Sequence, residues 1–480
     1  MTMFLQEVIQ KEVLLICKKL ISWKIISFFL MLYRYSVENY KSFKHCAELV
    51  MFPFAQEGVD GKTYWRKGEV TPVLKTCVIF GANASGKSNL IKSIAFAQSI
   101  ILNDIKISTE SNPCFKLDSD SIFQPTVFNF EMKIGERLLQ YGFSVLFREN
   151  RLMEEWLYDL DTDTQLFLRV YNSSNQRYEF DYDKENLEPS EIQRVDIYLE
   201  DLQQDNTRLL LTELAGKKMS DSHLWHTLHD TYQWFKDLRI LFPGSRYNLL
   251  MEVALDERRI NEIYKTYFKL FDIHIDNIHL NSIPIEMLHL SADIMDEMKK
   301  DLLKASGSVN TFVMATHGGH EYLIDMDGEG NLLAKEVKFR HLKDDGVTTY
   351  DFDKSEESDG TKRLFDLIPA LARMLSRDSV VIIDEIDRSL HSLLTHRLLR
   401  LFKQKSKDRN SQLICTTHEQ LLLDGALFRP DELWMVNLDE KTSQSELYSL
   451  AQYKVKFMEN IEKNYLLGRY KGIPLFDNLE

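Results

Sequence analysis

The sequence predicts an α/β fold with a parallel sheet at its centre, on the evidence of three short apolar runs. Residues 77–80 are followed by a glycine-rich stretch, residues 379–383 by two acids, and residues 412–417 by a histidine. None of the runs shows the strict alternation of a half-buried strand, as expected for parallel strands covered on both faces. Carboxyl ends of parallel strands share one edge of a sheet, so the residues after these runs are expected to build one site.

The glycine-rich stretch after the first run, Gly-Ala-Asn-Ala-Ser-Gly-Lys-Ser over residues 81–88, fits the phosphate-binding pattern G-x-x-x-x-G-K-[ST]. We call it the phosphate loop. Its glycines let successive N–H groups face an anion, and the helix predicted to follow adds its own unpaired donors. Lys87 is expected to reach the β- and γ-phosphates of a nucleotide and Ser88 to hold Mg²⁺. The expected nucleotide contacts are Gly81, Asn83, Ala84, Ser85, Gly86, Lys87, Ser88 and Asn89.

The acids after the second run complete a P-loop NTPase site. Asp384 is expected to bind Mg²⁺ together with Ser88, and Glu385 to polarise the attacking water. A strand-end acid pair alone could serve solubility only. Together with the phosphate loop it predicts hydrolysis of a nucleoside triphosphate.

A segment before a predicted helix over residues 364–375 resembles a known signature. It reads Glu-Glu-Ser-Asp-Gly-Thr-Lys-Arg over residues 356–363, with Ser358 suited to cap the helix and Gly360 leaving room for a ligand oxygen. It resembles the signature motif of ABC-type ATPase heads, which closes over ATP held by another subunit. Residues 386–391 look like the D-loop of those heads.

The third run also fits this resemblance, because His418 matches the switch histidine of ABC-type heads. Asp359 departs from the doubled glycine of transporter-type signatures. An acid near the γ-phosphate is electrostatically unfavourable, so the departure predicts hydrolysis that is slow or dependent on a partner.

The closest resemblance is to the abortive-infection and restriction-linked AAA/ABC-type ATPases of bacteria, relatives of the RecF, SMC and OLD ATPases. These include the ATPase subunits of phage-defence systems such as PARIS. The matching motifs lie at residues 37–43, 357–361, 384–391, 417–419 and 464–470. The resemblance implies an ABC-type head with an antiparallel β lobe and an inserted helical lid. It also implies ATP and Mg²⁺ as ligands, Glu385 and His418 as catalytic residues, and a homodimer or larger homo-oligomer formed through the heads.

The domain organisation follows from the motif spacing. Residues 31–185 are expected to hold the phosphate loop and the β lobe, with strands over residues 135–160, and residues 306–480 the signature, the acid pair and the histidine. Residues 186–305 between them are mostly helical in pattern without a sustained heptad, which predicts a compact lid rather than a coiled-coil arm. Residues 1–30 form a leader of doubtful status, either an over-long start or a helix that contacts a membrane surface or partner.

Composition narrows the function classes. The net charge of −14 argues against a surface that binds nucleic acid everywhere, while a local basic groove stays open. No apolar run is long enough to span a bilayer. The scattered cysteines lack CxxC spacing and indicate a reduced, cytoplasmic protein. They are Cys17, Cys46, Cys77, Cys114 and Cys415.

Two metal-like patterns are interpreted as structural. Asp325, Asp327, Glu329 and Glu336 mimic a calcium loop, but strand-like flanks favour a hairpin turn. The His-Gly-Gly-His of residues 317–320 has no cysteine or acid at ligand spacing and is expected to be a loop.

Three functions remain open beyond ATP hydrolysis. The first is a defence subunit that controls a separate effector, a nuclease or toxin, because only 62 residues follow His418 and a fused nuclease would need more. The second is a RecF- or SMC-like DNA-repair or recombination ATPase, which requires DNA-stimulated hydrolysis. The third, a transporter subunit, is disfavoured by the long insertion.

Overall fold

The computed structural model describes residues 30–54, 72–103, 112–185, 187–217, 222–243, 257–305, 313–317, 320–327, 329–407, 409–453 and 461–472. The chain forms two compact units. The larger unit consists of Ile26–Phe242, Asp378–Ile386 and Lys403–Glu480, and the smaller unit includes Pro243–Arg377 and Asp387–Phe402. The predicted leader at residues 1–30 lies outside the described residues except for Leu30.

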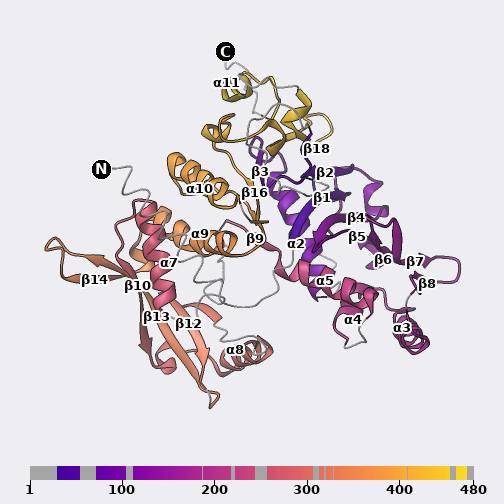
Figure 1. Cartoon of the computed structure of the whole chain (residues 1–480), viewed down its shortest axis with the longest axis horizontal. Coiled ribbons are helices and arrows are strands. Elements are labelled where there is room, and N and C mark those ends of the chain that lie inside the picture. Colours follow the sequence, from indigo (N-terminus) through magenta and orange to yellow (C-terminus); the bar gives the residue numbers. More distant parts are fainter. Residues whose placement is uncertain are drawn as a thin grey trace. The chain divides into compact units, whose positions relative to one another are not determined.

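The larger unit contains the predicted parallel sheet, with strands in the order β18-β17-β3-β16-β15-β9, of which β18, β3, β16 and β9 are labelled in Figure 1. All neighbours pair in parallel except the edge strand β18. The three strands predicted from apolar runs are adjacent in its middle, as β3, β16 and β15, which confirms the fold class. The strands are β3 (Thr76–Phe80), β9 (Arg239–Leu241), β15 (Val380–Ile383), β16 (Gln412–Thr416), β17 (Leu433–Leu438) and β18 (Ser445–Ser449).

A seven-stranded antiparallel sheet forms the predicted β lobe of the same unit, in the order β2-β1-β4-β5-β6-β7-β8. Side chains alternate between buried and partly exposed along β4, as period-two packing on a core requires. The strands predicted within residues 135–160 are confirmed as β5 and β6. The sheet comprises β1 (Leu30–Glu38), β2 (Ala47–Val50), β4 (Thr126–Ile134), β5 (Arg137–Leu146), β6 (Arg151–Asp159), β7 (Thr164–Asn172) and β8 (Arg177–Tyr182).

Helices join the two sheets of the larger unit into one core. Helix α2 packs against α4 and α5, and α5 against β4. Trp234 and Phe235 of α5 contact Phe130 of β4, with ring centroids 6.2 and 5.0 Å apart, so α5 packs on one face of the antiparallel sheet. The helices are α2 (Lys87–Asn103), α3 (Pro189–Leu202), α4 (Leu210–Ala215), α5 (His223–Asp237) and α11 (Ile461–Leu466).

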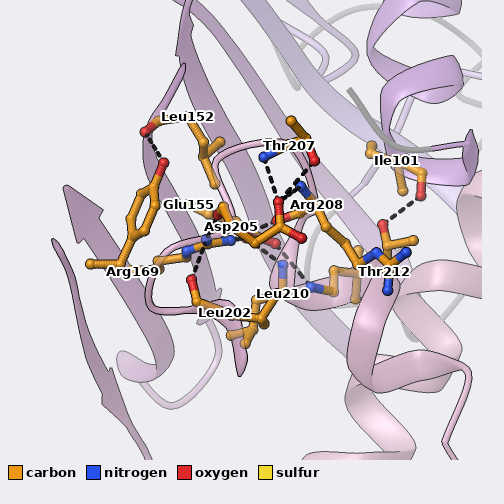
Figure 2. A network of polar contacts seen from close by, with 12 residues as sticks. Ile101, Leu152, Glu155, Arg169, Leu202, Asp205, Thr207, Arg208, Leu210 and Thr212 are labelled. Atoms are coloured by element: carbon orange, nitrogen blue, oxygen red, sulfur yellow. Dashed lines mark hydrogen bonds and ion pairs between the residues drawn. The ribbon is translucent and has the colours of Figure 1, made fainter. Parts of the chain in front are cut away.

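A buried polar network fastens the antiparallel sheet to the segment before α4 (Figure 2). Glu155 of β6 accepts the N–H groups of Leu210 and Leu211 at 2.7 and 3.0 Å, so its carboxylate caps the first turn of α4. Burial raises the pKa of Glu155, while the guanidinium of Arg169, 4.0 Å away, opposes this rise.

Arg169 of β7 is itself fully buried and donates hydrogen bonds to backbone carbonyls. Its guanidinium donates to the carbonyl oxygens of Arg208 at 2.7 Å and Leu202 at 3.0 Å, and also to that of Asp205. The side chain stacks 4.0 Å over the ring of Tyr178. Each carbonyl that it binds would otherwise be desolvated without a partner.

The smaller unit is built on a five-stranded antiparallel sheet in which β13 pairs with β10, β12 and β14, and β11 pairs with β12. Helix α7 packs against β10 and α9 (Figure 1). Tyr264 of α7 stacks on Phe365 of α9 at 4.7 Å. The elements are α7 (Glu257–Leu270), β10 (Asn277–Ile283), α8 (Ala292–Ala305), β11 (Val313–His317), β12 (His320–Met326), β13 (Leu332–Leu342), β14 (Thr349–Asp353) and α9 (Asp359–Ser376). Helix α10 (Ser392–Lys405) begins in this unit.

The stretch predicted as a helical insertion, residues 186–305, contains the expected helices but is divided between the units. Helices α3, α4 and α5 belong to the larger unit, and α7 and α8 to the smaller. Strands β9 and β10 also fall within it, and the helical pattern gave no sign of them. A three-residue edge strand and a strand paired to a distant partner carry little local periodicity.

Two further sequence expectations are tested by the described residues. Their cysteines are all free, with Cys77, Cys114 and Cys415 buried and Cys46 exposed. Within the same part of the chain, no helix is long and apolar enough to cross a membrane.

We predict that Arg169→Met lowers the free energy of unfolding by about 3 kcal/mol, because it leaves Glu155 buried without its cation and several carbonyls without donors. Urea denaturation of wild type and variant measures this. Arg177→Met, an exposed arginine on β8, is the control and should change stability by less than about 0.5 kcal/mol. Equal stability of Arg169→Met and wild type would show that the network contributes nothing.

Candidate phosphate-binding site

The phosphate loop connects β3 to α2, as the motif requires. Gly81 and Gly86 have φ values of +156° and +112°, and Ala84 also has a positive φ, of 62°. A side chain at Gly86 would overlap Ser445 Oγ and lie 2.8 Å from Ser42 Oγ. Glycine at position 86 is therefore required both by the backbone and by the close approach of two serines.

The serines around the loop hold it in shape. Ser445 Oγ donates to the carbonyl of Ser85 at 2.6 Å, and Asn89 Nδ2 donates to Ser42 Oγ at 2.9 Å. Asn83 and Ala84, at the tip of the loop, are exposed. The buried Ser85 Oγ has no hydrogen-bond partner among the described residues, which suits a loop that is completed by an anion.

Ser88 and Asp384 meet across two strand ends, although 296 residues separate them. Ser88 Oγ donates to Asp384 Oδ1 at 3.2 Å. Thr416 Oγ1, at the end of β16, donates to the same carboxylate oxygen at 2.6 Å. A hydroxyl and a carboxylate are the oxygen donors that Mg²⁺ prefers, so the predicted metal-ligating pair fits that ion.

Lys87 lies inside the loop that it is expected to serve. Its ammonium donates to the carbonyls of Gly81 at 2.7 Å and Ala82 at 2.9 Å, and lies 3.4 Å from His418 Nδ1. Lys87 is buried, whereas His418 is exposed at the sheet edge. The predicted phosphate-binding lysine and the predicted switch histidine therefore lie next to each other. A terminal phosphate bound there would contact both side chains.

Glu385 follows Asp384 in a strained conformation. Its φ is +49°, which is uncommon for a residue with a side chain and costs about 1–2 kcal/mol. The strain is held by two backbone hydrogen bonds: Glu385 N donates to Thr416 Oγ1 at 2.8 Å, and Ile386 N to the carbonyl of Thr416 at 3.0 Å. The chain thus turns sharply after β15, which sets the direction of the Glu385 carboxylate.

The predicted signature residues lie in the smaller unit. Ser358 caps α9, with its side chain accepting the N–H of Thr361 at 3.1 Å, as the sequence predicts. Gly360 sits against the residues that resemble a D-loop, because an added Cβ would lie 3.0 Å from the carbonyl oxygen of Ser389. The glycine is therefore needed for close backbone packing within the unit. Asp359 beside it is 84% exposed.

Charged pairs hold the segment that leads into Ser358. Lys354, in the short 3₁₀ helix η5 (Lys354–Glu356), donates to Glu321 at 2.8 Å and Asp366 at 2.7 Å and is buried. His341 Nε2 lies 2.6 Å from Glu357 Oε1, one residue before Ser358. Contacts from β12, β13 and α9 therefore fix the approach to the signature.

A three-residue group with metal-ligand chemistry lies on the same sheet. Ligand atoms of His320, Glu336 and Asp353 are all within 4.8 Å of one another. No acid partner for His320 could be identified from the spacing of residues, because the partners lie on neighbouring strands. Lys338 contacts both carboxylates, 2.9 Å from Glu336, and thus already supplies the compensating cation. The nearby calcium-like pattern is a hairpin turn, as predicted: Asp327 accepts the N–H groups of Glu329 and Asn331.

Three residues of the site were missed from sequence. Thr416 binds the carboxylate of Asp384 and the backbone of Glu385 through its hydroxyl. A hydroxyl at the end of a predicted buried strand could have identified this residue from the sequence. Ser42 and Ser445 buttress the phosphate loop from segments far away in the chain. Ser42 lies within the motif over residues 37–43, but nothing in either segment indicates a contact with the phosphate loop, since serines in turns are common.

Residues 77–424, well over half of the chain, match the family described as "AAA domain, putative AbiEii toxin, Type IV TA system". Among solved structures, the SMC head domain from Thermotoga maritima is similar at 13% identity and a TM-score of 0.33, with 87% of this chain and 98% of that chain covered. An Smc head with an extended coiled coil, bound to the C-terminal domain of ScpA from Pyrococcus furiosus, is similar at 13% identity and a TM-score of 0.34, covering 92% and 100%. No curated protein matches the chain.

We predict that Thr416→Val weakens magnesium-dependent binding of a nucleoside triphosphate about tenfold, because Asp384 loses the hydroxyl that orients it. Isothermal titration calorimetry with and without Mg²⁺ measures the effect. Thr416→Ser keeps the hydroxyl and should bind like wild type. Equal weakening by the serine variant would assign the effect to packing in β16 rather than to the hydrogen bond.

Proposed function

Because this chain belongs to the AAA-domain family that includes the AbiEii type, we propose that it binds ATP with Mg²⁺ and hydrolyses it. The observation that carries the proposal is the 3.2 Å contact between Ser88 Oγ and Asp384 Oδ1 beneath the phosphate loop, with Lys87 beside it. These are the groups needed to bind the phosphates and their metal ion, brought together at the carboxyl ends of β3 and β15, which flank β16.

The site residues would divide the work as follows. The N–H groups of the phosphate loop and Lys87 bind the β- and γ-phosphates, and Ser88 with Asp384 holds the metal. Mg²⁺, when bound, neutralises charge on the phosphate oxygens. Glu385 orients the attacking water. His418, 3.4 Å from Lys87, contacts the γ-phosphate and responds to its loss.

A second copy of the chain would complete the site. Ser358 and Gly360 of the partner subunit, at the start of its α9, would close over the nucleotide held by the first copy. The exposed position of Ser358 at the start of the long helix α9 supports this role. Because each copy offers both faces, the contact is reciprocal, and a two-fold homodimer is the smallest closed assembly.

The wider role rests on the family and on the sequence resemblance. We propose a bacterial anti-phage function in which ATP-dependent dimerisation controls a separate nuclease or toxin. A RecF- or SMC-like role in DNA repair is the alternative, and it requires hydrolysis that duplex or single-stranded DNA accelerates. ATPase assays with and without DNA separate the two, since acceleration by DNA favours the repair role.

We predict that Glu385→Gln traps an ATP-bound dimer. Loss of the carboxylate should slow hydrolysis at least about 100-fold while leaving the phosphate loop intact. Light scattering with MgATP should show twice the monomer mass for this variant. The double variant Glu385→Gln/Lys87→Ala should keep the monomer mass. A variant that binds ATP in calorimetry but keeps the monomer mass would overturn the dimer model. Absence of ATP binding by wild type would overturn the ATPase proposal itself.

We predict that Ser358→Arg binds ATP with wild-type affinity but neither dimerises nor hydrolyses it efficiently, because the bulky cation blocks closure over the partner's nucleotide. Ser355→Arg, an exposed serine three residues earlier, is the matched control. Binding by calorimetry and mass by light scattering give the two readouts. If Ser358→Arg dimerises normally in the Glu385→Gln background, the signature segment is not part of the dimer interface.

A further inference from the structure

The motif at residues 464–470 has no role in the site described above, although it belongs to the same unit as the phosphate loop. It begins within α11 and continues into the turn after that helix. Its polar and aromatic side chains Asn464, Tyr465 and Tyr470 are all buried. Together with the two residues that follow, the motif forms a stretch over residues 464–472 that we call the α11 segment.

The α11 segment contacts the chain where β3 ends and the phosphate loop begins. The ring of Tyr465 packs against the ring of Phe80, the last residue of β3, with the ring centroids 6.4 Å apart. A Cβ added at Gly472 would lie 3.8 Å from the Cα of Gly81, the first residue of the loop. The backbones of these two glycines therefore pass close to each other with no side chain between them.

Gly81 is crowded by a second strand as well. A Cβ added at Gly81 would lie only 2.4 Å from the carbonyl oxygen of Val436, which follows the residue of β17 that pairs with Phe80. A Cβ added at Gly472 would lie 3.8 Å from that same oxygen. Three backbone segments thus meet at the first residue of the phosphate loop. In a close-packed interior, a shift of one segment is transmitted to the others.

Hydrogen bonds hold Gly472 at this meeting point. The hydroxyl of Tyr465 donates to the carbonyl of Gly472 at 2.9 Å, and the N–H of Gly472 donates to Asn437 Oδ1 at 3.3 Å. The hydroxyl of Tyr448 on β18 donates to the carbonyl of Tyr470 at 2.6 Å. Gly472 has a φ of +72°, a left-handed conformation that favours glycine.

The position of Gly81 matters for phosphate binding because its carbonyl also holds Lys87. The ammonium of Lys87 donates to the carbonyl of Gly81 at 2.7 Å and to that of Ala82 at 2.9 Å. Displacement of Gly81 would therefore move an acceptor of the lysine. It would also change the direction of the loop N–H groups, whose common direction makes the loop an anion site.

We propose that the α11 segment is a positioning element of the phosphate loop, in which Tyr465 and Gly472 hold Gly81 and, through its carbonyl, Lys87. The inference rests on the proposed nucleotide binding and adds to it two residues that lie far from the loop in the sequence. They act through the backbone of the loop and set its affinity for the phosphates. The residues that follow β15, on another strand, keep their own contacts when the α11 segment is altered.

The first test is Gly472→Ala, which places a side chain in a left-handed conformation and should displace the α11 segment from Gly81. Calorimetric titration of the full chain with MgATP should show an affinity about tenfold weaker than that of wild type. Gly135→Ala is the matched control, because Gly135 has a φ of +62° in the same unit and its Cβ would meet open space. This control carries similar backbone strain and should bind MgATP like wild type.

The second test is Tyr465→Phe, which removes only the hydroxyl that binds the carbonyl of Gly472. It should weaken MgATP binding about threefold. Tyr178→Phe is its control, because the hydroxyl of Tyr178 also donates to a backbone carbonyl, that of Leu152 in the antiparallel sheet, at 2.8 Å. The control loses the same kind of hydrogen bond and should keep wild-type affinity.

Steady-state ATPase assays separate positioning from a purely structural role. Gly472→Ala and Tyr465→Phe should raise KM for ATP and keep kcat within about threefold of wild type, because weaker phosphate binding affects substrate and transition state alike. A purely structural role would lower the thermal midpoint and leave KM unchanged.

Two results would overturn the inference and leave the proposed ATPase in place. The first is wild-type affinity for MgATP in both Gly472→Ala and Tyr465→Phe, and the second is an equal loss of affinity in the two control variants. Thermal midpoints show whether each variant is folded during the titration, and Tyr465→Phe decides alone if Gly472→Ala does not fold. If wild type itself binds no MgATP, the proposed function fails and this inference fails with it.

Discussion

The parallel pairing of β3, β16 and β15 is the constraint on which the site depends. These three strands come from distant parts of the sequence, yet their pairing places the phosphate loop, Thr416 and Asp384 at one sheet edge. Ser88 and Asp384 then meet at 3.2 Å. The strands are buried on both faces, so a shift in register would disturb the whole core before it disturbed the site. The packing that stabilises the core therefore also fixes the geometry of the site.

Around this edge, the chain places hydroxyl and backbone groups where a ligand would otherwise have to organise them. Ser445 binds the carbonyl of Ser85 in the phosphate loop and Ser42 binds Asn89 directly after it, while Thr416 binds both the carboxylate of Asp384 and the backbone of Glu385. Lys87 rests on the carbonyls of its own loop. In the proposed phosphate complex, Lys87 would exchange these carbonyl oxygens for phosphate oxygens, so little reorganisation would be needed.

In the smaller unit, ion pairs rather than hydroxyl groups hold the functional segment in place. Its sheet uses buried and half-buried ion pairs to hold the few residues before Ser358, as Lys354 does with Glu321 and Asp366. Such pairs contribute little net stability compared with apolar packing, but each one requires a defined geometry. They fix where α9 begins, and the start of that helix is the part of the unit that the proposed dimer would present to its partner.

Local patterns in the sequence determined the strands β3, β15 and β16, the phosphate loop, the cap at Ser358 and the hairpin at Asp327, because each depends on residues close together in the chain. Tertiary structure alone decided the roles of Thr416, Ser42 and Ser445, the acid partners of His320, and the division of residues 186–305 between two units. All of these depend on strands and turns that meet across long sequence separations. A single hydroxyl or carboxylate gives no periodic sequence pattern from which a contact with a distant segment could be predicted.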